Sequence, residues 1–421
     1  MGATYIEKII QRNTGKSSVK PGDIVTVLVD RVMIHDIFIP FVAEKFEEMG
    51  FQKLWDPDKV VLIYDHLVPA SQLDDIRHFK AGDTFAAKYG MTHVHRSDGI
   101  CHQLMTEAGY VKPGDVVFGT DSHTTTYGCV GAFSSGIGYT EMASILGTGT
   151  MWIRVPETIK VVIDGELPDS VMSKDVILRL IGDLGADGAT YRALEFCGSA
   201  IDKMSISSRM TMANMAIEAG AKCALFTPDE KTAEYCQIPL TEELRNLKGD
   251  EDASYLKVLH YQAEDLVPVL ACPSQVDNIR PVSELEGTKI DQVFIGSCTN
   301  GRLEDLAVAA SVLKGRKVAP YVKLIITPAS RKVYLDAIRA GIMNILIEAG
   351  AVITHPGCGL CCGRTGGILC DGERVVATNN RNFLGRMGTS KVEIFLASPA
   401  TAAASAMAGV ICAASKEQAE V

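Results

Sequence analysis

Short runs of apolar, mostly β-branched residues alternate along the chain with longer segments in which apolar residues recur every three to four positions. The short runs predict strands, and the longer periodic segments predict amphipathic helices. Several runs are apolar throughout, which is typical of parallel strands that are covered on both faces. The expected strands span residues 23–32, 59–66, 114–123, 158–167, 292–298, 322–330 and 351–358.

Helical periodicity is clearest in four segments, and two of them carry recognisable end signals. Ser173 and Ser330 are suited to helix starts, and Gly185 and Gly350 to helix ends. The expected helices span residues 41–50, 173–185, 209–221 and 330–351. Strands and helices that alternate in this way predict the α/β class, with stacked three-layer α/β/α domains.

The chain of 421 residues is longer than one hydrophobic core usually supports, so more than one domain is expected. Polar, turn-rich sequence over 240–254 and 272–289 interrupts the periodic pattern and predicts a boundary near 275–285. We therefore expect an α/β region over 1–280, formed by two intertwined subdomains, and a third α/β domain over 285–421.

Composition and charge narrow the possible functions. The net charge of −10, the pI near 5.5 and the lack of a concentrated Lys/Arg stripe argue against nucleic-acid binding. The amino terminus lacks an export-signal pattern, and no apolar run reaches the length of a spanning helix, so we expect a cytoplasmic protein without membrane association. In a reducing cytosol the 12 cysteines are expected to be thiols, thiolates or metal ligands.

Polar residues directly follow several of the expected strands. They include Asp65-His66, Asp121-Ser122-His123, Ser297 to Asn300 and His355 to Cys358. In open α/β sheets ligands bind beyond the carboxyl ends of the strands, so these loops are expected to face one cleft. For any one of these loops alone, an ordinary turn is the simpler interpretation.

Three cysteines lie within five positions in the stretch "THPGCGLCCGRTGG" at 354–367. The C-x-x-C spacing of Cys358 and Cys361 occurs in redox pairs, zinc sites and iron–sulfur sites alike. Cys298, at the end of an expected strand, is a candidate partner. Together with His355 these cysteines could also complete a four-ligand zinc site.

Seven ordered motifs resemble the aconitase superfamily along nearly the whole chain. They are "DH" at 65–66, "GICHQ" at 99–103, "GTDSHT" at 119–124, "NMAIEAGA" at 214–221, "GSCTN" at 296–300, "CGLC" at 358–361 and "NRNFLGRMG" at 380–388. The resemblance implies an aconitase-like fold with one [4Fe–4S] cluster per subunit, held by Cys298, Cys358 and Cys361. Three thiolates leave one iron open to act as a Lewis acid on a substrate hydroxyl group. Cys362, and Leu360 in place of a common proline, depart from the family pattern.

The resemblance also implies roles around that iron. Arg381 and Arg386, beside Asn380, would bind substrate carboxylates, for which the planar guanidinium is suited. Substrate contacts are also expected from Ser122 and Asn214. The catalytic candidates, which would contact the hydroxyl group or carry its proton, are Asp65, His66, His102, Asp121, His123 and Glu218. No role is assigned to His35, His78, His93 or His95.

Single-chain aconitases carry a "GSSRxH"-like loop in an additional domain, and no such loop occurs in this sequence. "GTSKVE" at 388–393 instead leads into an apparent strand. We therefore expect the large subunit of a two-subunit hydro-lyase, a heterodimer or heterotetramer whose small subunit supplies the base. The expected substrate is a small hydroxy dicarboxylic acid of the 2,3-dimethylmalate or 3-isopropylmalate class. The alternatives are a homoaconitase and a non-enzymatic zinc or iron redox sensor.

Overall fold

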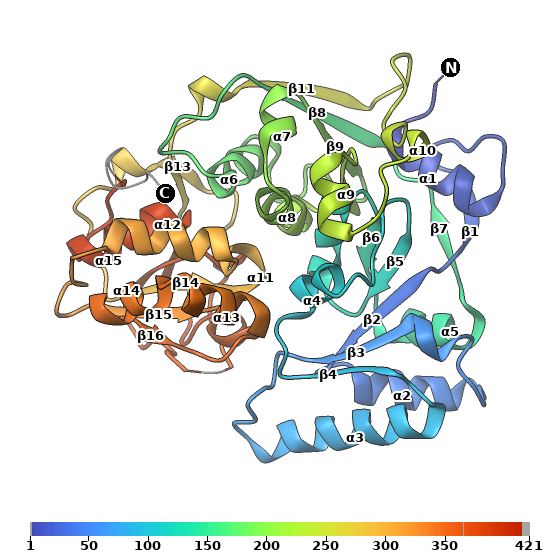
Figure 1. Ribbon diagram of the computed structural model, residues 1–421, viewed down its shortest axis with the longest axis horizontal. Helices are drawn as coiled ribbons and strands as arrows, with labels where there is room; N and C mark the ends of the chain where they lie inside the picture. The colour runs from blue at the N-terminus through green and yellow to red at the C-terminus, as the bar shows by residue number, and fades with distance from the viewer. Residues whose placement is uncertain (1, 365, 415–421) are drawn as a thin grey trace.

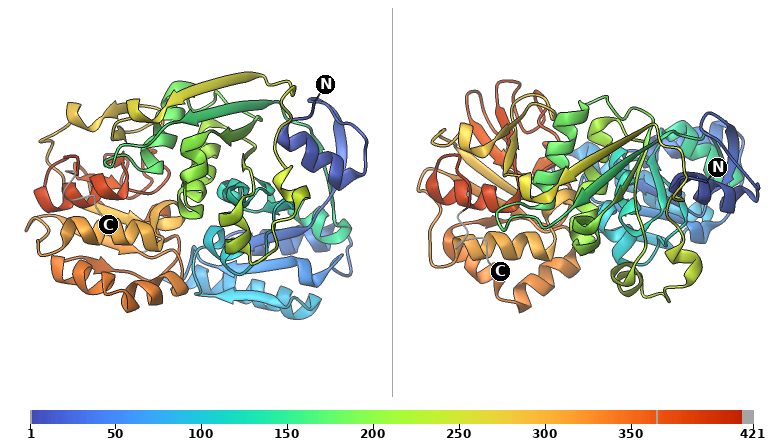
Figure 2. Two further views of the ribbon diagram at one scale, coloured as in Figure 1. Left: turned by 45° about the horizontal axis from the view of Figure 1, so that its top comes forward. Right: turned by 90° about the horizontal axis from the view of Figure 1, so that it is seen from above.

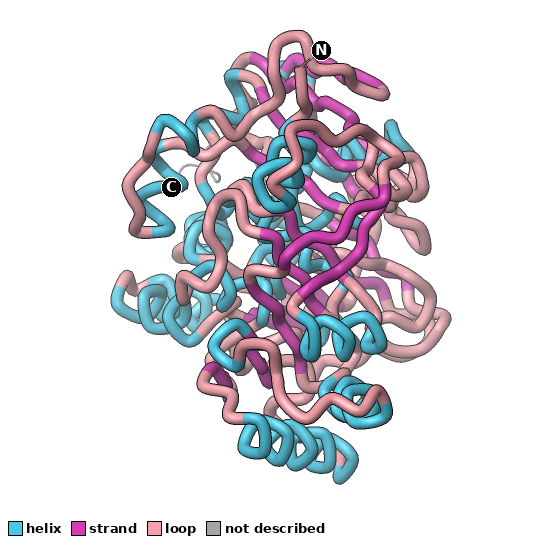
Figure 3. Tube along the Cα trace, turned by 90° about the vertical axis from the view of Figure 1, so that its right-hand side faces the viewer, coloured by secondary structure: helices cyan, strands magenta, loops and turns pink. Residues whose placement is uncertain are grey.

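The computed structural model describes residues 2–364 and 366–414 (Figure 1). The first part of the chain, in blue and cyan, and the last part, in orange and red, form two neighbouring lobes. The green and yellow segments between them in sequence lie across the top of both lobes, and the same arrangement is seen in Figure 2. Figure 3 shows most strands in the interior and most helices at the periphery, as expected for the α/β class.

The first lobe is built on a parallel five-stranded sheet with the order β4-β3-β2-β5-β6. Its strand order reverses between β2 and β5, which is where ligands bind in open α/β sheets. The strands are β2 (Arg31–His35), β3 (Val60–Tyr64), β4 (His93–Arg96), β5 (Val116–Gly119) and β6 (Phe133–Gly136). The helices in this part of the chain are α1 (Tyr5–Thr14), α2 (Ile39–Glu48), α3 (Leu73–Tyr89), α4 (Cys101–Glu107) and α5 (Tyr139–Thr148).

The last lobe contains a seven-stranded sheet with the order β13-β12-β18-β17-β14-β15-β16. Five strands are parallel, and β12 and β13 extend the sheet in antiparallel fashion. The strands are β12 (Val269–Ala271), β13 (Ile279–Pro281), β14 (Gln292–Gly296), β15 (Lys323–Thr327), β16 (Val352–Ile353), β17 (Arg374–Ala377) and β18 (Glu393–Leu396). Here the order reverses between β14 and β17, which is a second position of the kind at which ligands bind in open α/β sheets.

The helices of the last lobe cover this sheet. They are α11 (Ser297–Asn300), α12 (Leu303–Leu313), α13 (Arg331–Arg339), α14 (Ile342–Ala349) and α15 (Pro399–Ala408). The expected single helix over 330–351 is divided into α13 and α14, because Gly341 adopts a left-handed φ of 74° between them. The helix signals at Ser330 and Gly350 were therefore correct, and the interruption between them was missed.

A parallel four-stranded sheet, β10-β9-β8-β11, lies between the lobes in sequence. Its strands are β8 (Thr158–Asp164), β9 (Ala193–Cys197), β10 (Cys223–Phe226) and β11 (Lys257–Gln262). The associated helices are α6 (Ser173–Leu184), α7 (Ser199–Lys203), α8 (Ile206–Met215), α9 (Glu230–Cys236) and α10 (Glu242–Arg245). Short 3-10 helices occur at Pro57–Lys59, Ser122–Val130, Ala216–Ala219, Ala263–Asp265, Val282–Glu284 and Gly359–Cys362.

The expected strand at 23–32 forms two strands that belong to different sheets. β1 (Ile24–Leu28) pairs with β7 (Thr150–Arg154) in a two-stranded antiparallel ribbon, and β2 begins at Arg31. The carboxylate of Asp30 accepts a hydrogen bond from the backbone N–H of Val116 at 2.8 Å, and this contact fixes the turn between the two strands. A continuous apolar run therefore concealed a change of sheet.

A single hydrophobic cluster links all three large sheets. It includes the fully buried Met33 of β2, Leu194 of β9 and Phe294 of β14. Burial of one such side chain contributes about 1.5–3 kcal/mol, so the sheets are held together by a common core. Because β12 and β13 pair with β18, the last sheet includes residues from 269 onward, and the division into 1–280 and 285–421 stays a prediction. Within the described ranges, no helix is both long enough and apolar enough to cross a bilayer.

Candidate active site

The carboxyl ends of strands from both lobes meet around one cavity of about 150 Å³. The loops that follow β2, β3 and β5 approach it from the first lobe, and those that follow β14 and β17 approach it from the last lobe. Ten of the predicted site residues line the cavity: His66, His102, Asp121, His123, Cys298, Cys358, Cys361, Asn380, Arg381 and Arg386. The four other predicted residues lie directly behind them: Asp65, Ser122, Asn214 and Glu218. The expectation that the strand-end loops share one cleft is therefore confirmed.

Backbone geometry positions the thiol of Cys298. β14 ends at Gly296, whose φ of 153° and close approach to β15 require glycine, because a Cβ there would lie 2.4 Å from the carbonyl oxygen of Thr327. Ser297 then adopts a left-handed φ of 68°. This sharp turn places Cys298 in the first turn of α11, where it is buried.

The other two thiols lie at the 3-10 turn at Gly359–Cys362, which Cys358 precedes and which contains Cys361. The N–H of Cys358 donates to the carbonyl oxygen of Asp65 at 2.9 Å, which joins this turn to the loop that follows β3. A Cβ at Gly357 would lie 2.7 Å from the same carbonyl oxygen, so glycine permits the close approach. Cys358 and Cys361 are both buried, whereas Cys362 is half-buried and also lines the cavity.

Amide and guanidinium groups surround the sulfur atoms. The Nδ2 atom of Asn214 donates to Cys298 Sγ at 3.2 Å. Asn380 lies between two thiols, with Nδ2 3.5 Å from Cys298 Sγ and Oδ1 3.4 Å from Cys361 Sγ. A guanidinium nitrogen of Arg386 lies 3.9 Å from Cys361 Sγ. Hydrogen-bond donors of this kind support thiolates and the electron-rich groups that thiolates bind.

Burial raises the pKa values of Cys298 and Cys361, whereas neighbouring hydrogen bonds and positive charge lower them. Burial raises the pKa of the Cys298 thiol to about 12. The hydrogen bond from Cys358, together with Arg386, lowers the pKa of Cys361 well below its usual value. Three buried thiols with amide and cationic neighbours are a donor set that suits a thiolate-bound iron–sulfur cluster. His355, which the zinc alternative would use as a fourth ligand, is exposed and does not line the cavity.

A chain of carboxylates and imidazoles forms the opposite wall. Asp65 Oδ1 lies 2.7 Å from His66 Nδ1, and Asp121 Oδ2 lies 3.6 Å from His66 Nε2. Asp121 Oδ1 also lies 2.9 Å from His102 Nε2 and 3.2 Å from His123 Nδ1. The single carboxylate of Asp121 therefore contacts the imidazoles of His66, His102 and His123.

These contacts give the histidines different protonation preferences. Burial alone would lower the pKa of His66, but Asp65 and Asp121, with Asp36 behind them, raise it well above the usual value. For His123, Asp121 and Glu218 outweigh burial and Arg381, and its pKa is raised as well. Burial dominates at His102 and lowers its pKa. At neutral pH the wall therefore combines a protonated His66 with a neutral His102, a separation typical of acid–base sites.

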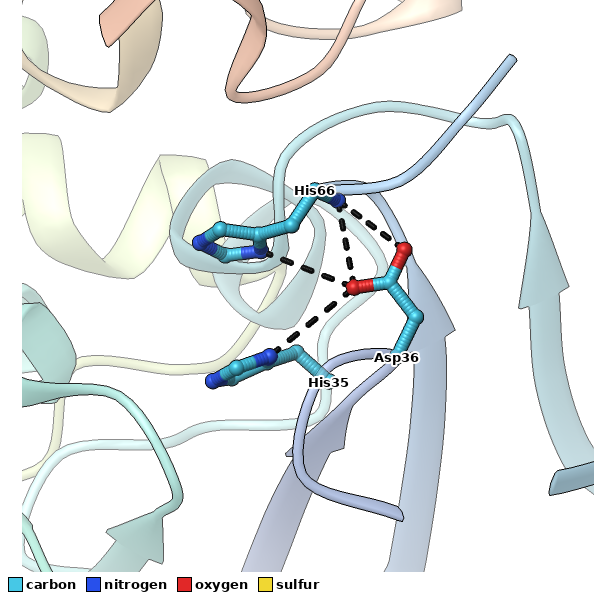
Figure 4. A group of neighbouring side chains, drawn as sticks. All are labelled: His35, Asp36 and His66. Carbon is cyan, nitrogen blue, oxygen red and sulfur yellow. Dashed lines mark hydrogen bonds and ion pairs between the residues drawn. The ribbon is translucent and has the colours of Figure 1, made fainter. Parts of the chain in front are cut away.

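Asp36, which was not singled out from the sequence, fixes the loop that carries Asp65 and His66. Its carboxylate accepts hydrogen bonds from the backbone N–H groups of Asp65, His66 and Leu67 at 3.0, 3.1 and 2.8 Å. Figure 4 shows the rings of His35 and His66 one above the other, with Asp36 facing both; the ring centroids are 4.4 Å apart.

His35 lines the cavity, although the sequence analysis assigned it no role. The signal that selected Asp65-His66, polar residues directly after an apolar run, is also present at His35-Asp36. The same criterion, applied to the strand that ends at 35, would have found both residues.

The arginines complete the site. Arg381 Nε lies 2.8 Å from Glu218 Oε1, and its terminal nitrogen donates to Ser122 Oγ at 2.9 Å. Arg386 Nε is buried without a hydrogen-bond partner among the described residues. Arg386 itself lines the cavity, and its guanidinium has more donors than the described contacts use, which suits a carboxylate ligand.

Lys174 was also missed from the sequence. It is fully buried in α6, and its Nζ donates to the carbonyl oxygens of Thr378 and Asn379 at 2.7 Å each. Burial lowers the pKa of Lys174 to about 7. These bonds hold the segment that leads directly into Asn380 and Arg381. No sequence signal indicates this contact, because Lys174 lies between Ser173 and Asp175 in the polar first turn of an amphipathic helix.

Comparison with known proteins agrees with this geometry. The model of the aconitase family (aconitate hydratase) matches residues 7–289 and 278–409, and the chain belongs to that family. The predictions of an aconitase-type fold and of a hydro-lyase are thereby confirmed.

Curated relatives match the chain along nearly its full length. The 3-isopropylmalate dehydratase large subunit 1 of Methanopyrus kandleri is 50% identical over 98% of both chains. The 3-isopropylmalate dehydratase large subunit of Thermodesulfovibrio yellowstonii is 46% identical over 98% of both chains. The 3-isopropylmalate dehydratase large subunit 1 of Pyrococcus furiosus is 47% identical over 97% of this chain and 98% of its own.

Proposed function

We propose that this chain is the large, [4Fe–4S]-bearing subunit of a cytosolic 3-isopropylmalate dehydratase. The observation that carries the proposal is the single cavity at which three buried thiols, two arginines and a histidine–carboxylate wall meet. The names of the relatives favour 3-isopropylmalate over 2,3-dimethylmalate and over a homoaconitase substrate.

One cluster per subunit would be held by Cys298, Cys358 and Cys361. When bound, the cluster would supply a Lewis-acidic iron that weakens the bond between the substrate carbon and its hydroxyl group. The amide groups of Asn214 and Asn380 orient the thiols and donate to sulfur. The guanidinium of Arg386 compensates negative charge at Cys361.

The other polar groups of the site bind the substrate and transfer its proton. Arg381 and Arg386 bind the substrate carboxylates, and Ser122 holds the Arg381 guanidinium in place. Protonated His66 donates its Nε2 proton toward the departing hydroxyl group, while Asp65 on Nδ1 holds the ring and sustains its charge. Asp121 contacts His66, His102 and His123 and so fixes the orientation of their rings. Glu218 links His123 to Arg381.

A small subunit would complete the site as a heterodimer or heterotetramer and supply the base for the carbon-bound proton. The relatives are themselves named large subunits, which supports a partner of this kind. This chain itself supplies the thiols, imidazoles and guanidinium groups that line the cavity. The partner is therefore expected to contribute to substrate turnover rather than to cluster binding.

The test is to produce the chain under anaerobic conditions, alone and together with its small subunit. We expect the chain alone to hold about four iron and four sulfide per molecule, as the proposed cluster requires. The complex should dehydrate 3-isopropylmalate with a higher kcat/KM than 2,3-dimethylmalate or homocitrate. A colourless protein with one equivalent of zinc would support the redox-sensor alternative, and a preference for another acid would reassign the substrate.

A further inference from the structure

The cysteine-bearing cavity is lined by polar side chains over most of its surface and by apolar side chains at one part. Thiols, imidazoles, carboxylates and guanidinium groups occupy most of it, but Ile37, Phe38 and Ile100 form an apolar wall. None of these three side chains can bind a carboxylate or carry a proton. We propose that this apolar wall receives the alkyl substituent of the substrate and that Phe38 sets the size of the substituent accepted. This inference rests on the proposed function.

The short segment that carries the wall is fixed in position. The N–H of Phe38 donates to the carbonyl oxygen of His35 at 3.2 Å, and the N–H of Ile37 lies 3.3 Å from His35 Nδ1. Helix α2 begins immediately afterwards at Ile39, with Pro40 in its first turn. A segment tied to β2 on one side and to a helix start on the other presents its side chains in a defined geometry.

Aromatic neighbours hold the Phe38 ring. The ring of His35 lies edge-on to it at a centroid distance of 5.1 Å, and those of Tyr139 and Phe41 lie 6.2 and 6.3 Å away. Phe38 is half-buried and lines the cavity. A half-buried ring with this support offers apolar surface to a ligand without needing to move.

The location of Phe38 relates the apolar wall to the substrate-binding arginine. Phe38, Asp121 and Arg381 line the small cavity and also a wider adjoining cavity of about 650 Å³. A dicarboxylate whose carboxylate binds Arg381 therefore has Phe38 at the border between the two spaces. A substituent that points away from the imidazoles passes this ring, whose apolar surface suits a branched alkyl group.

The test uses the reconstituted two-subunit enzyme and three malates that carry hydrogen, methyl or isopropyl at C3. One methylene in an apolar pocket changes kcat/KM by roughly 10-fold or more. Phe38→Ala should therefore lower kcat/KM for the isopropyl compound by about 10-fold or more, with a change below about 3-fold for the unsubstituted malate. Phe38→Trp, which fills the space instead, should reduce turnover of the isopropyl compound and leave the methyl compound nearly unchanged.

Two controls separate specificity from general damage. Phe51→Ala removes another half-buried phenylalanine, packed on Phe46 away from the cavity, and should leave the substrate ratio unchanged. Thermal unfolding and iron content of each variant report on folding and cluster retention. Equal losses for all three malates in folded, iron-loaded Phe38 variants would overturn the inference while the proposed function stands. Failure of the unmodified enzyme to dehydrate any of them would instead refute the proposed function.

Discussion

The backbone N–H of Cys358 donates to the carbonyl oxygen of Asp65 at 2.9 Å, and so connects a cysteine-bearing turn of one lobe to the histidine-bearing loop of the other. The carboxylate of the same Asp65 lies 2.7 Å from His66 Nδ1. One residue thus positions the thiol turn through its backbone and the imidazole through its side chain. The proposed ligand set and the proposed acid are therefore mechanically coupled.

Asp65→Asn should move the alkaline limit of activity to lower pH. His66 has its pKa raised by Asp65, so its proton is retained at neutral pH and lost only as the pH rises through that elevated value. An amide cannot supply the same attraction, whereas burial continues to lower the pKa. The pH dependence of kcat/KM measures the shift. As a control, Asp98→Asn changes a comparable carboxylate–imidazole pair, Asp98–His95, outside the cavity. This variant should leave the alkaline limit of activity unchanged.

Cys358→Ser should abolish cluster retention and activity, because two remaining thiolates rarely hold a four-iron cluster. Iron and sulfide analysis, with electron paramagnetic resonance of the reduced protein, measures the loss directly. The exposed Cys370 provides a control: Cys370→Ser should retain the full iron content. A Cys358 variant with full iron and full turnover would remove this residue from the ligand set.

Arg381→Lys should weaken substrate use although it keeps the positive charge. A lysine cannot contact Glu218 and Ser122 and also present a planar fork to a carboxylate. Loss of one charge-assisted hydrogen bond of about 1.5–3 kcal/mol corresponds to roughly a 10- to 150-fold lower kcat/KM. Steady-state kinetics of the complex measures this. Arg179→Lys, at an exposed position in α6, is the matched control, and equal kinetics for the two variants would exclude Arg381 from the site.

Lys174→Met should destabilise the last lobe. Removal of the amino group leaves the buried carbonyl oxygens of Thr378 and Asn379 without their donor, at a cost of about 1–3 kcal/mol for each. Urea unfolding of the purified chain should therefore show a lower free energy of unfolding than the unmodified protein. Lys314→Met, at the exposed end of α12, should change it by less than about 0.5 kcal/mol. Similar losses in both variants would contradict the proposed bonding role.

Local sequence signals were sufficient to predict the loops of the site where the end of one strand carries several polar residues. Asp121 to His123 and Ser297 to Asn300 follow apolar runs, and their loops reach the cavity as expected. The order of the strands in each sheet could not be derived in this way. The pairing of β2 with both β3 and β5 depends on contacts between residues far apart in sequence, which periodicity does not record.

Buried polar residues show the same limit of prediction from sequence. Lys174 occupies a helix pattern that reads as amphipathic, and its two acceptors lie more than 200 positions later in the chain. The strand-end signal points to Asp36, but it does not reveal the three backbone N–H groups of a neighbouring loop that Asp36 binds. The tertiary fold alone creates these contacts.

The two reversals of strand order have a mechanical consequence. The groups that handle protons are mounted on the first sheet, and the groups that hold sulfur-bound metal and anions are mounted on the last. Two hydrogen bonds, from the Cys358 N–H to the Asp65 carbonyl oxygen and from the Arg381 guanidinium to Ser122 Oγ, cross from the loops of one sheet to those of the other. A rotation of one sheet against the other would change the distance between acid and ligand only by breaking these bonds, so the contacts that join the lobes also fix that distance.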